Sequence, residues 1–246
     1  MSAALAQIWR HPVKAIGREG LDRATLAPGR TLPFDRHWAV THENAKPVSG
    51  GWAKKANFLR GVSGPSLMAV TARLDEATMT VTLAHPDRPE IAVAPDAEPD
   101  ALLAWLRPIW PDALPAPAGV ETSAQGFTDV PDPWISVHLS ASHAAVEGAV
   151  GQPLSRHRWR GNLWIDGLEP WSEFDLVGRT VRIGDAVLRG VQPITRCRAT
   201  EANPDTGRRD VDTLAALRGF GHQDFGLYAE VLEGGTVAPG PAVRLS

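Results

Sequence analysis

The stretch Ile194-Thr195-Arg196-Cys197-Arg198-Ala199-Thr200-Glu201-Ala202-Asn203-Pro204-Asp205-Thr206-Gly207 holds the only cysteine of this 246-residue chain. Two arginines flank Cys197, and a turn-forming Asn-Pro-Asp-Thr-Gly sequence follows it. A thiol acts as a nucleophile or metal ligand in its thiolate form, and neighbouring cations favour that form. Cys197 is therefore either a reactive sulfur or a small buried apolar residue. Composition alone favours the second interpretation, and the flanking charges argue for the first.

The overall composition limits the classes of protein that this chain can be. Its length fits one large domain or two small ones, and 43% of the residues are hydrophobic, which is enough for a substantial core. A net charge of −3 gives no sign of a nucleic-acid surface. One cysteine excludes an internal disulfide, a cysteine-rich zinc site and a cysteine-ligated iron–sulfur cluster on this chain. With no signal peptide and no long apolar run, we expect a cytoplasmic protein without a membrane span.

Short alternating runs between glycines and prolines predict a chain made mainly of strands. Strands are expected at 5–9, 21–27, 35–41, 91–93, 135–139, within 161–167, 225–232 and 242–245, with hairpins at 68–74/79–83 and across 180–189. Helices are expected at 99–107, at 141–150 with Ser140 as the N-cap, and at 211–220. Prolines between residues 111 and 133 predict a linker or extended crossing segment. This pattern is typical of a barrel or sandwich.

Three groups of cations are candidates for an anion site. Lys14 lies in a loop with two arginines, and Arg196 and Arg198 flank the cysteine. Arg156, Arg158 and Arg160 alternate, so they would share one face if that stretch is extended. Arginine binds phosphate with two parallel hydrogen bonds, but each group could equally be a solvated surface. The eight histidines show no paired metal-ligand spacing; His138 is expected in the core, and His222 is a weak candidate base for Cys197.

Five pieces of sequence, in chain order, carry a resemblance to a known family. They are Ile8-Trp9-Arg10-His11-Pro12-Val13-Lys14, then Asp35-Arg36-His37-Trp38-Ala39-Val40, then Trp159-Arg160-Gly161-Asn162 with Asp166-Gly167, then Arg196-Cys197 with Thr200 and Asn203 to Gly207, and finally Phe225-Gly226-Leu227-Tyr228 with the glycines of 235–240. Together they resemble the MOSC family, named after the C-terminus of molybdenum cofactor sulfurase. The likeness extends over nearly the whole chain and fits the subgroup that includes the mitochondrial amidoxime-reducing components.

The resemblance implies a MOSC-type β-barrel with an N-terminal β-barrel region and a few short helices, a mainly β (α+β) fold. It places an N-terminal domain at 1–112 and the MOSC domain at 113–246. It also implies a molybdenum cofactor, with Cys197 as both metal ligand and catalytic residue. The residues that would bind the cofactor are Lys14 and Arg36 at its phosphate, Arg160 and Asn162 at its pterin, Ser140 or Ser142 along it, and Arg196 and Tyr228 beside it.

Three positions depart from the pattern of the family. The family's Lys-Ser pair is Lys14-Ala15 here, its Pro before the Asn is Gly161, and the Asp of its Asp-Pro turn is Asn203. These changes bear on cofactor affinity and substrate class more than on the fold.

The resemblance predicts an oxidoreductase that reduces small N-hydroxylated or N-oxide-like substrates. With one cysteine on the chain, the electrons must come from a separate protein, such as a ferredoxin, a cytochrome b5-like protein or a flavin reductase. Two alternatives use the same site: a sulfurtransferase that carries a persulfide on Cys197, and a cofactor carrier without turnover. Pyridoxal phosphate and nucleic acid are not expected to bind.

Overall fold

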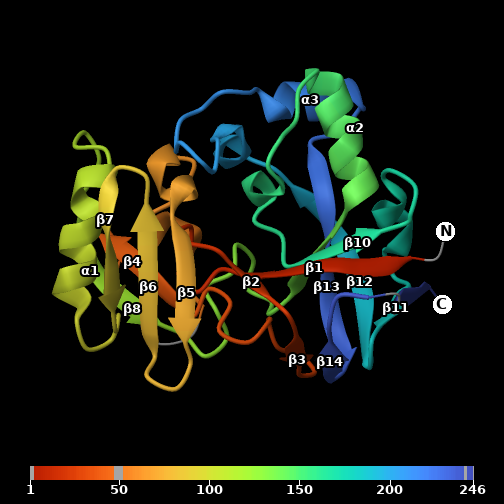
Figure 1. Cartoon of the computed structure of the whole chain (residues 1–246), viewed down its shortest axis with the longest axis horizontal. Coiled ribbons are helices and arrows are strands. Elements are labelled where there is room, and N and C mark those ends of the chain that lie inside the picture. The colour runs from red at the N-terminus through yellow and green to blue at the C-terminus, as the bar shows by residue number, and fades with distance from the viewer. Residues whose placement is uncertain (1–2, 47–51, 241–242, 246) are drawn as a thin grey trace.

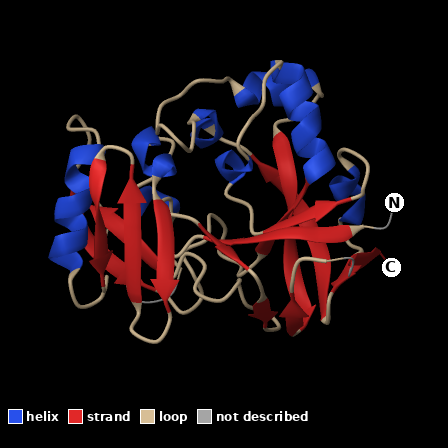
Figure 2. Cartoon of the chain, in the orientation of Figure 1, coloured by secondary structure: helices blue, strands red, loops and turns tan. Residues whose placement is uncertain are grey.

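The computed structural model describes residues 3–46, 52–240 and 243–245, whose regular structure is mostly β-strand (Figure 2). These residues form four sheets, with three α-helices and several short 3-10 helices around them. The prediction of a mainly β, α+β fold is therefore confirmed.

The largest sheet has eight strands in the order β15-β11-β12-β13-β9-β10-β1-β2. Their bounds are β1 Ala4–Arg10, β2 Glu19–Leu21, β9 Ile135–Leu139, β10 Leu163–Asp166, β11 Thr180–Ile183, β12 Ala186–Thr195, β13 Asp224–Glu233 and β15 Val243–Leu245. Only β9 and β10 are parallel neighbours, and helix α2 (Ser140–Val150) lies in the long connection that a parallel pair requires. Within the described ranges no pairing joins β15 to β2, so the hydrogen-bonded order does not close into a barrel.

Alternation along the strands builds the core of this sheet. On β11, for example, Val181 and Ile183 are buried and Arg182 between them is exposed, because successive side chains point to opposite faces. Leu188 of β12 and Leu227 of β13 join the same apolar cluster. The sequence pattern of period two therefore corresponds directly to the buried face.

A second group of strands lies to one side of the large sheet, drawn in orange to lime in Figure 1. It consists of the pair β4 (Trp38–His42) and β8 (Pro117–Thr122), the sheet β5 (Thr71–Asp75), β6 (Thr80–His85) and β7 (Arg88–Val93), helix α1 (Pro99–Leu106), and the 3-10 helices η1 (Lys55–Asn57), η2 (Pro65–Ala69) and η3 (Arg107–Ile109). Its core is a separate cluster that includes Trp38, Leu102 and Trp105. Pro99 occupies the first turn of α1, where its missing N–H costs no hydrogen bond.

The remaining elements connect the two groups or cover the large sheet. They are the paired strands β3 (Ala24–Leu26) and β14 (Gly235–Val237), the 3-10 helices η4 (Arg156–Trp159), η5 (Ser172–Leu176) and η6 (Arg198–Glu201), and helix α3 (Thr213–Gly219). Strands β1 and β2 come first in the chain but pair inside the large sheet. The division into 1–112 and 113–246 stays a prediction.

Several local predictions need correction. Residues 21–27 form parts of two strands. The segment predicted as a linker or extended crossing segment contains strand β8, which pairs with β4 despite the prolines. Ser140 is the first residue of α2 and does not cap it; its hydroxyl donates to Asp166 instead. The strand predicted for 35–41 begins at Trp38, since Arg36 has a left-handed backbone with φ +54°. Residue 242, the predicted start of the last strand, lies outside the described residues.

No helix in the described ranges is long and apolar enough to cross a membrane.

Candidate functional site

A cavity of about 480 Å³ is lined by residues from both groups of strands. This volume suits a small organic ligand. Most of the predicted site residues line it together, although they are far apart in the sequence: Lys14, Arg36, Arg160, Asn162, Arg196, Cys197 and Tyr228. Ser140 and Ser142 are not among its lining residues. Ser142 is buried, where its hydroxyl donates to Glu173 (2.7 Å) and accepts from the backbone N–H of Trp171 (2.8 Å).

Cys197 is presented where the long strand β12 gives way to η6. Its thiol is exposed, which excludes the interpretation as a buried apolar residue. The backbone around it is fixed, because the Cys197 carbonyl accepts from both the N–H and the hydroxyl of Thr200, each at 3.1 Å. The Thr200 hydroxyl also contacts that of Thr213 on α3 at 2.6 Å. The loop therefore offers an accessible sulfur from a well-anchored position.

The Arg196 guanidinium is held by neutral groups only. It donates to the carbonyls of Phe225 (2.8 Å from Nε) and Trp159 (2.9 Å), and to the His138 ring nitrogen Nε2 at 2.6 Å. Burial lowers the pKa of Arg196 to about 10, and its proximity to Tyr228 and Cys197 opposes that shift. Since Arg196 has no carboxylate partner among the described residues, its charge acts on whatever anion lies beside Cys197.

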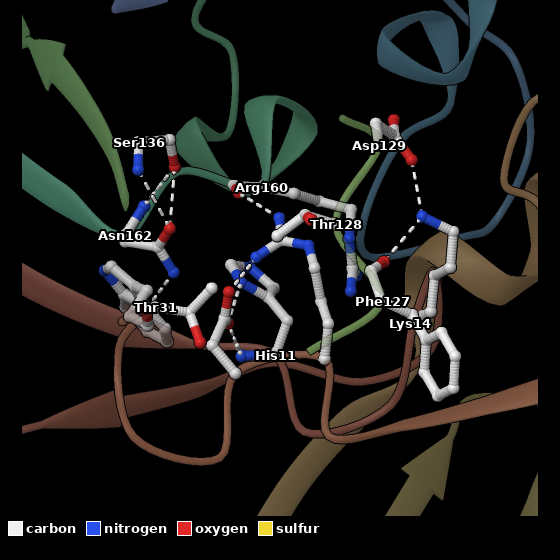
Figure 3. Close-up of polar contacts among 12 residues, drawn as sticks. His11, Lys14, Thr31, Phe127, Thr128, Asp129, Ser136, Arg160 and Asn162 are labelled. Atoms are coloured by element: carbon white, nitrogen blue, oxygen red, sulfur yellow. Dashed lines mark hydrogen bonds and ion pairs between the residues drawn. The ribbon is translucent and has the colours of Figure 1, made fainter. Parts of the chain in front are cut away.

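Lys14 and Asp129 form the most direct ion pair inside the cavity (Figure 3). The Lys14 ammonium lies 2.5 Å from Asp129 Oδ1 and donates to the Phe127 carbonyl at 2.8 Å. Burial lowers the pKa of Lys14, and the Asp129 carboxylate opposes that shift. Burial alone would raise the pKa of Asp129, but Lys14 and then Arg36 outweigh it and lower the pKa to about 2. The Asp129 carboxyl group is therefore ionised at neutral pH.

Several residues that line this cavity have strained backbone conformations. Six non-glycine residues in the described chain have positive φ, and three of them line the cavity: Ala15 (+62°), Arg36 (+54°) and Arg160 (+50°). Each such residue costs about 1–3 kcal/mol, and strained positions of this kind cluster at binding and active sites. The left-handed geometry directs two guanidinium groups into one space. Burial and the charge of Arg36 lower the pKa of Arg160 to about 9.

The stretch that carries the three alternating arginines is not extended, so the condition for a shared face is not met. Residues Arg156–Trp159 form a 3-10 helix instead of an extended stretch. Arg158 turns inward and pairs with Asp210 at 2.7 Å, and Arg156 lies over the Trp164 ring. Arg160 donates to the Gly17 carbonyl at 3.1 Å.

Asn162 connects three strands of the large sheet (Figure 3). Its Oδ1 accepts from the N–H and hydroxyl of Ser136 (3.1 and 2.8 Å), and its Nδ2 donates to the Trp9 carbonyl at 3.1 Å. The residue is 2% exposed, so its polar groups are used within the protein. Asn162 thus fixes the wall of the cavity.

Two family models together match almost the whole sequence. The MOSC N-terminal beta barrel domain matches residues 2–129, and the MOSC domain matches residues 127–244. The chain belongs to the MOSC family. This family is associated with molybdenum cofactor binding. No curated protein matches the sequence.

Solved structures similar to this MOSC chain include YiiM from Geobacillus stearothermophilus, with 23% identity and a TM-score of 0.35, over 46% of this chain and 53% of YiiM. YUAD protein from Bacillus subtilis is 12% identical over 98% of this chain and 93% of its own, with a TM-score of 0.45. The chain therefore spans about half the length of YiiM.

Two departures from the MOSC pattern have local physical reasons. A Cβ at Gly161 would lie 1.9 Å from Nδ1 of His138, so the buried imidazole occupies the space of a side chain there. Asn203 keeps the turn by accepting from the Asp205 N–H at 2.8 Å. Its amide also donates to Asp210 at 2.8 Å, a contact that an aspartate could not make without repulsion. For Ala15 the structure offers no comparable compensation.

The sequence did not indicate several cavity residues. Asp129 and Trp134 lie in or beside the proline-rich segment predicted as a linker or extended crossing segment, and Ser136 lies inside a plain apolar strand. His222, the candidate base, does not line the cavity; it packs against Trp171 with ring centroids 4.7 Å apart. No local pattern marks Asp129 as a cavity residue, because the lysine with which it pairs lies 115 positions earlier in the chain.

Two buried histidines, His11 and His138, and the half-buried His157 predict that the fold is sensitive to acid. Burial lowers the pKa of His11 to about 3 and that of His157 to about 4, and it places that of His138 well below its usual value. An unfolded histidine takes up a proton near pH 6.5, so the free energy of unfolding falls as pH drops below about 6.5. We expect the melting temperature to fall by several degrees between pH 7 and pH 5.

Calorimetry at both pH values checks this expectation. His157→Gln should flatten part of the pH dependence, and His222→Gln serves as the control for loss of a histidine. Equal melting temperatures at pH 7 and pH 5 would contradict the prediction.

Proposed function

We propose that this MOSC protein holds a molybdenum cofactor through Cys197 and reduces small N-hydroxylated or N-oxide-like substrates. One observation carries the proposal: the exposed Cys197 thiol opens on the same cavity as Lys14, Arg36 and Arg160. A thiolate is a suitable ligand for a soft redox metal, and the cations suit the phosphate of a pterin cofactor.

The chemistry of the cavity fits such a cofactor. In the part of the chain that the structure describes, no group of three or more His, Cys, Asp or Glu side chains could hold a metal ion. A metal here would therefore depend on ligands supplied by its own organic carrier, with Cys197 as the ligand from the protein. When bound, the cofactor supplies a metal centre that exchanges electrons with the substrate.

The residues of the chain would hold and orient the cofactor and supply polar contacts. Lys14 and Arg36 would bind its phosphate, with Asn162 and Arg160 fixing the wall along its pterin. Burial, followed by the charge of Asp129, raises the pKa of Tyr228, so its hydroxyl keeps its proton and can donate to a polar ligand. Reduction of an N-hydroxyl group consumes two electrons and two protons and releases water. The electrons would come from a separate ferredoxin, cytochrome b5-like protein or flavin reductase.

Metal analysis tests the proposal directly. Wild type and Cys197→Ser from a cofactor-competent host are compared by mass spectrometry. We expect molybdenum near one per chain in the wild type and at least fivefold less in the variant, because serine replaces a thiolate by a poorly ionised hydroxyl. Circular dichroism controls for folding, since the exposed thiol makes few packing contacts.

Other outcomes would favour the alternatives. If neither protein holds molybdenum, the proposal fails, and a persulfide on Cys197 detected by intact mass would favour sulfur transfer. If the wild type holds molybdenum but reduces benzamidoxime with none of the three donor classes, the protein would be a cofactor carrier.

A further inference from the structure

The charges that line the cavity are unbalanced. Among the described residues, seven cationic side chains and one carboxylate, Asp129, line it. Lys14, Arg36, Arg158, Arg160 and Arg196 each donate to carboxylates, carbonyls or a histidine of the protein. Lys55 is close enough to Asp129 to lower the pKa of that carboxyl group. Arg60 differs from all of these: its guanidinium makes no hydrogen bond or ion pair with any residue in the described ranges.

The backbone that carries Arg60 is nevertheless fixed. Leu59 before it is fully buried and donates its N–H to the Val40 carbonyl at 2.8 Å. The Arg60 carbonyl accepts from the N–H groups of Ser63 and Gly64 at 3.0 and 2.9 Å. A half-buried guanidinium on a rigid segment is prepared for a ligand, because little conformational entropy is lost when one binds.

The segment that carries Arg60 also lies beside the cysteine loop. A Cβ on the following Gly61 would be 3.5 Å from the Cβ of Ala199, two residues after Cys197. Arg209 ties the same segment to the C-terminal half by donating to the Val62 carbonyl at 2.6 Å. The phosphate is proposed to bind elsewhere, at Lys14 and Arg36. Arg60 is therefore available to a molecule that approaches Cys197.

We propose that Arg60 binds a carboxylate of the substrate, so that the protein prefers N-hydroxylated substrates that carry a negative charge. This inference rests on the proposed function for the reaction, but the anion site can be tested without it. The planar guanidinium can form two parallel hydrogen bonds to a carboxylate, which a neutral amide of the same shape cannot reproduce.

Calorimetry compares benzoate with its neutral isostere benzamide on the molybdenum-loaded full chain. We expect benzoate to bind at least tenfold more tightly to the wild type, as one charge-assisted hydrogen bond pair implies. Arg60→Gln should bring the two ligands to within about twofold. Arg60→Lys keeps the charge but loses the planar guanidinium, so its preference for benzoate over benzamide should be intermediate. Arg107→Gln, which removes an exposed arginine outside the cavity, should behave as the wild type.

Activity gives a second readout. The kcat/KM ratio of 4-carboxybenzamidoxime to benzamidoxime should fall about tenfold in Arg60→Gln. Equal binding of benzoate and benzamide to the wild type, or an unchanged ratio in Arg60→Gln, would overturn the inference. A loss of molybdenum from Arg60→Gln would assign the residue to the cofactor and overturn it as well. If neither amidoxime is reduced, the proposed function fails, while the benzoate comparison still decides the role of Arg60.

Discussion

Gly161→Ala is expected to destabilise the protein by about 3 kcal/mol, at the upper end of overpacking effects. The added Cβ would lie 1.9 Å from His138 Nδ1, and the ring cannot move away. His138 is fully buried, stacks on Phe225, and faces Gly226 on its other side, where a Cβ would be 2.1 Å from its Cδ2. For a chain of this length the melting temperature should fall by roughly 6–12 °C.

The double variant with His138→Ala tests the cause. Removing the imidazole alone should cost about 2–4 kcal/mol, because it leaves a cavity and deprives Arg196 of an acceptor. In that background Gly161→Ala should cost almost nothing further, since the new Cβ enters vacated space. Gly148→Ala, where a Cβ meets nothing within 4 Å, is the matched control and should be neutral or stabilising. Additive losses in the double variant would show that the contact is not the reason for the glycine.

The contact between Gly161 and His138 also shows which features of the site the sequence could and could not predict. The MOSC motifs predicted that Cys197, Arg196 and Lys14 come together, and the three residues line one cavity. The pattern could not reveal that His138, 23 residues earlier in the chain, fills the space of the side chain missing at Gly161. Packing between residues distant in sequence has no local signature.

Two further differences between the sequence predictions and the structure have a similar origin. The alternating arginines at 156, 158 and 160 would share one face only in an extended stretch, but Ser155 accepts from the His157 N–H and a 3-10 turn begins there. The proline-rich segment gave no local sign of β8 or of the role of Asp129. The strand that pairs with β8 is β4, and the lysine that pairs with Asp129 is Lys14, and both lie far away in the sequence. Local propensity was overridden by tertiary contacts in each case.

Lys14→Met is expected to lower molybdenum retention by about 10- to 100-fold. The Lys14 side chain is 4% exposed and is flanked by Arg36 and Arg160, so no water or mobile cation readily replaces its charge. Losing a hydrogen bond to a charged group costs about 1.5–3 kcal/mol, and the Asp129 partner of Lys14 is itself 56% exposed. Molybdenum per chain after desalting measures the loss, and the circular dichroism spectrum confirms folding.

Asp129→Asn should act in the opposite direction. The Asp129 carboxylate pairs with the Lys14 ammonium at 2.5 Å. The proposed phosphate would bind the same ammonium, so the two anions compete for Lys14. Asparagine keeps the shape and a carbonyl acceptor but removes the charge. In protein produced without the cofactor, inorganic phosphate should bind about tenfold more tightly to Asp129→Asn than to wild type, and not measurably to Lys14→Met.

Acid should not mimic this substitution. Because the pKa of Asp129 is lowered to about 2, the carboxyl group stays ionised at pH 5, and phosphate affinity should not rise between pH 7 and pH 5 through its protonation. Displacement of Asp129 therefore has to come from the ligand itself, as the stronger anion in the pair with Lys14. Wild-type phosphate affinity in Asp129→Asn would mean that Asp129 shares Lys14 with the ligand instead of competing for it.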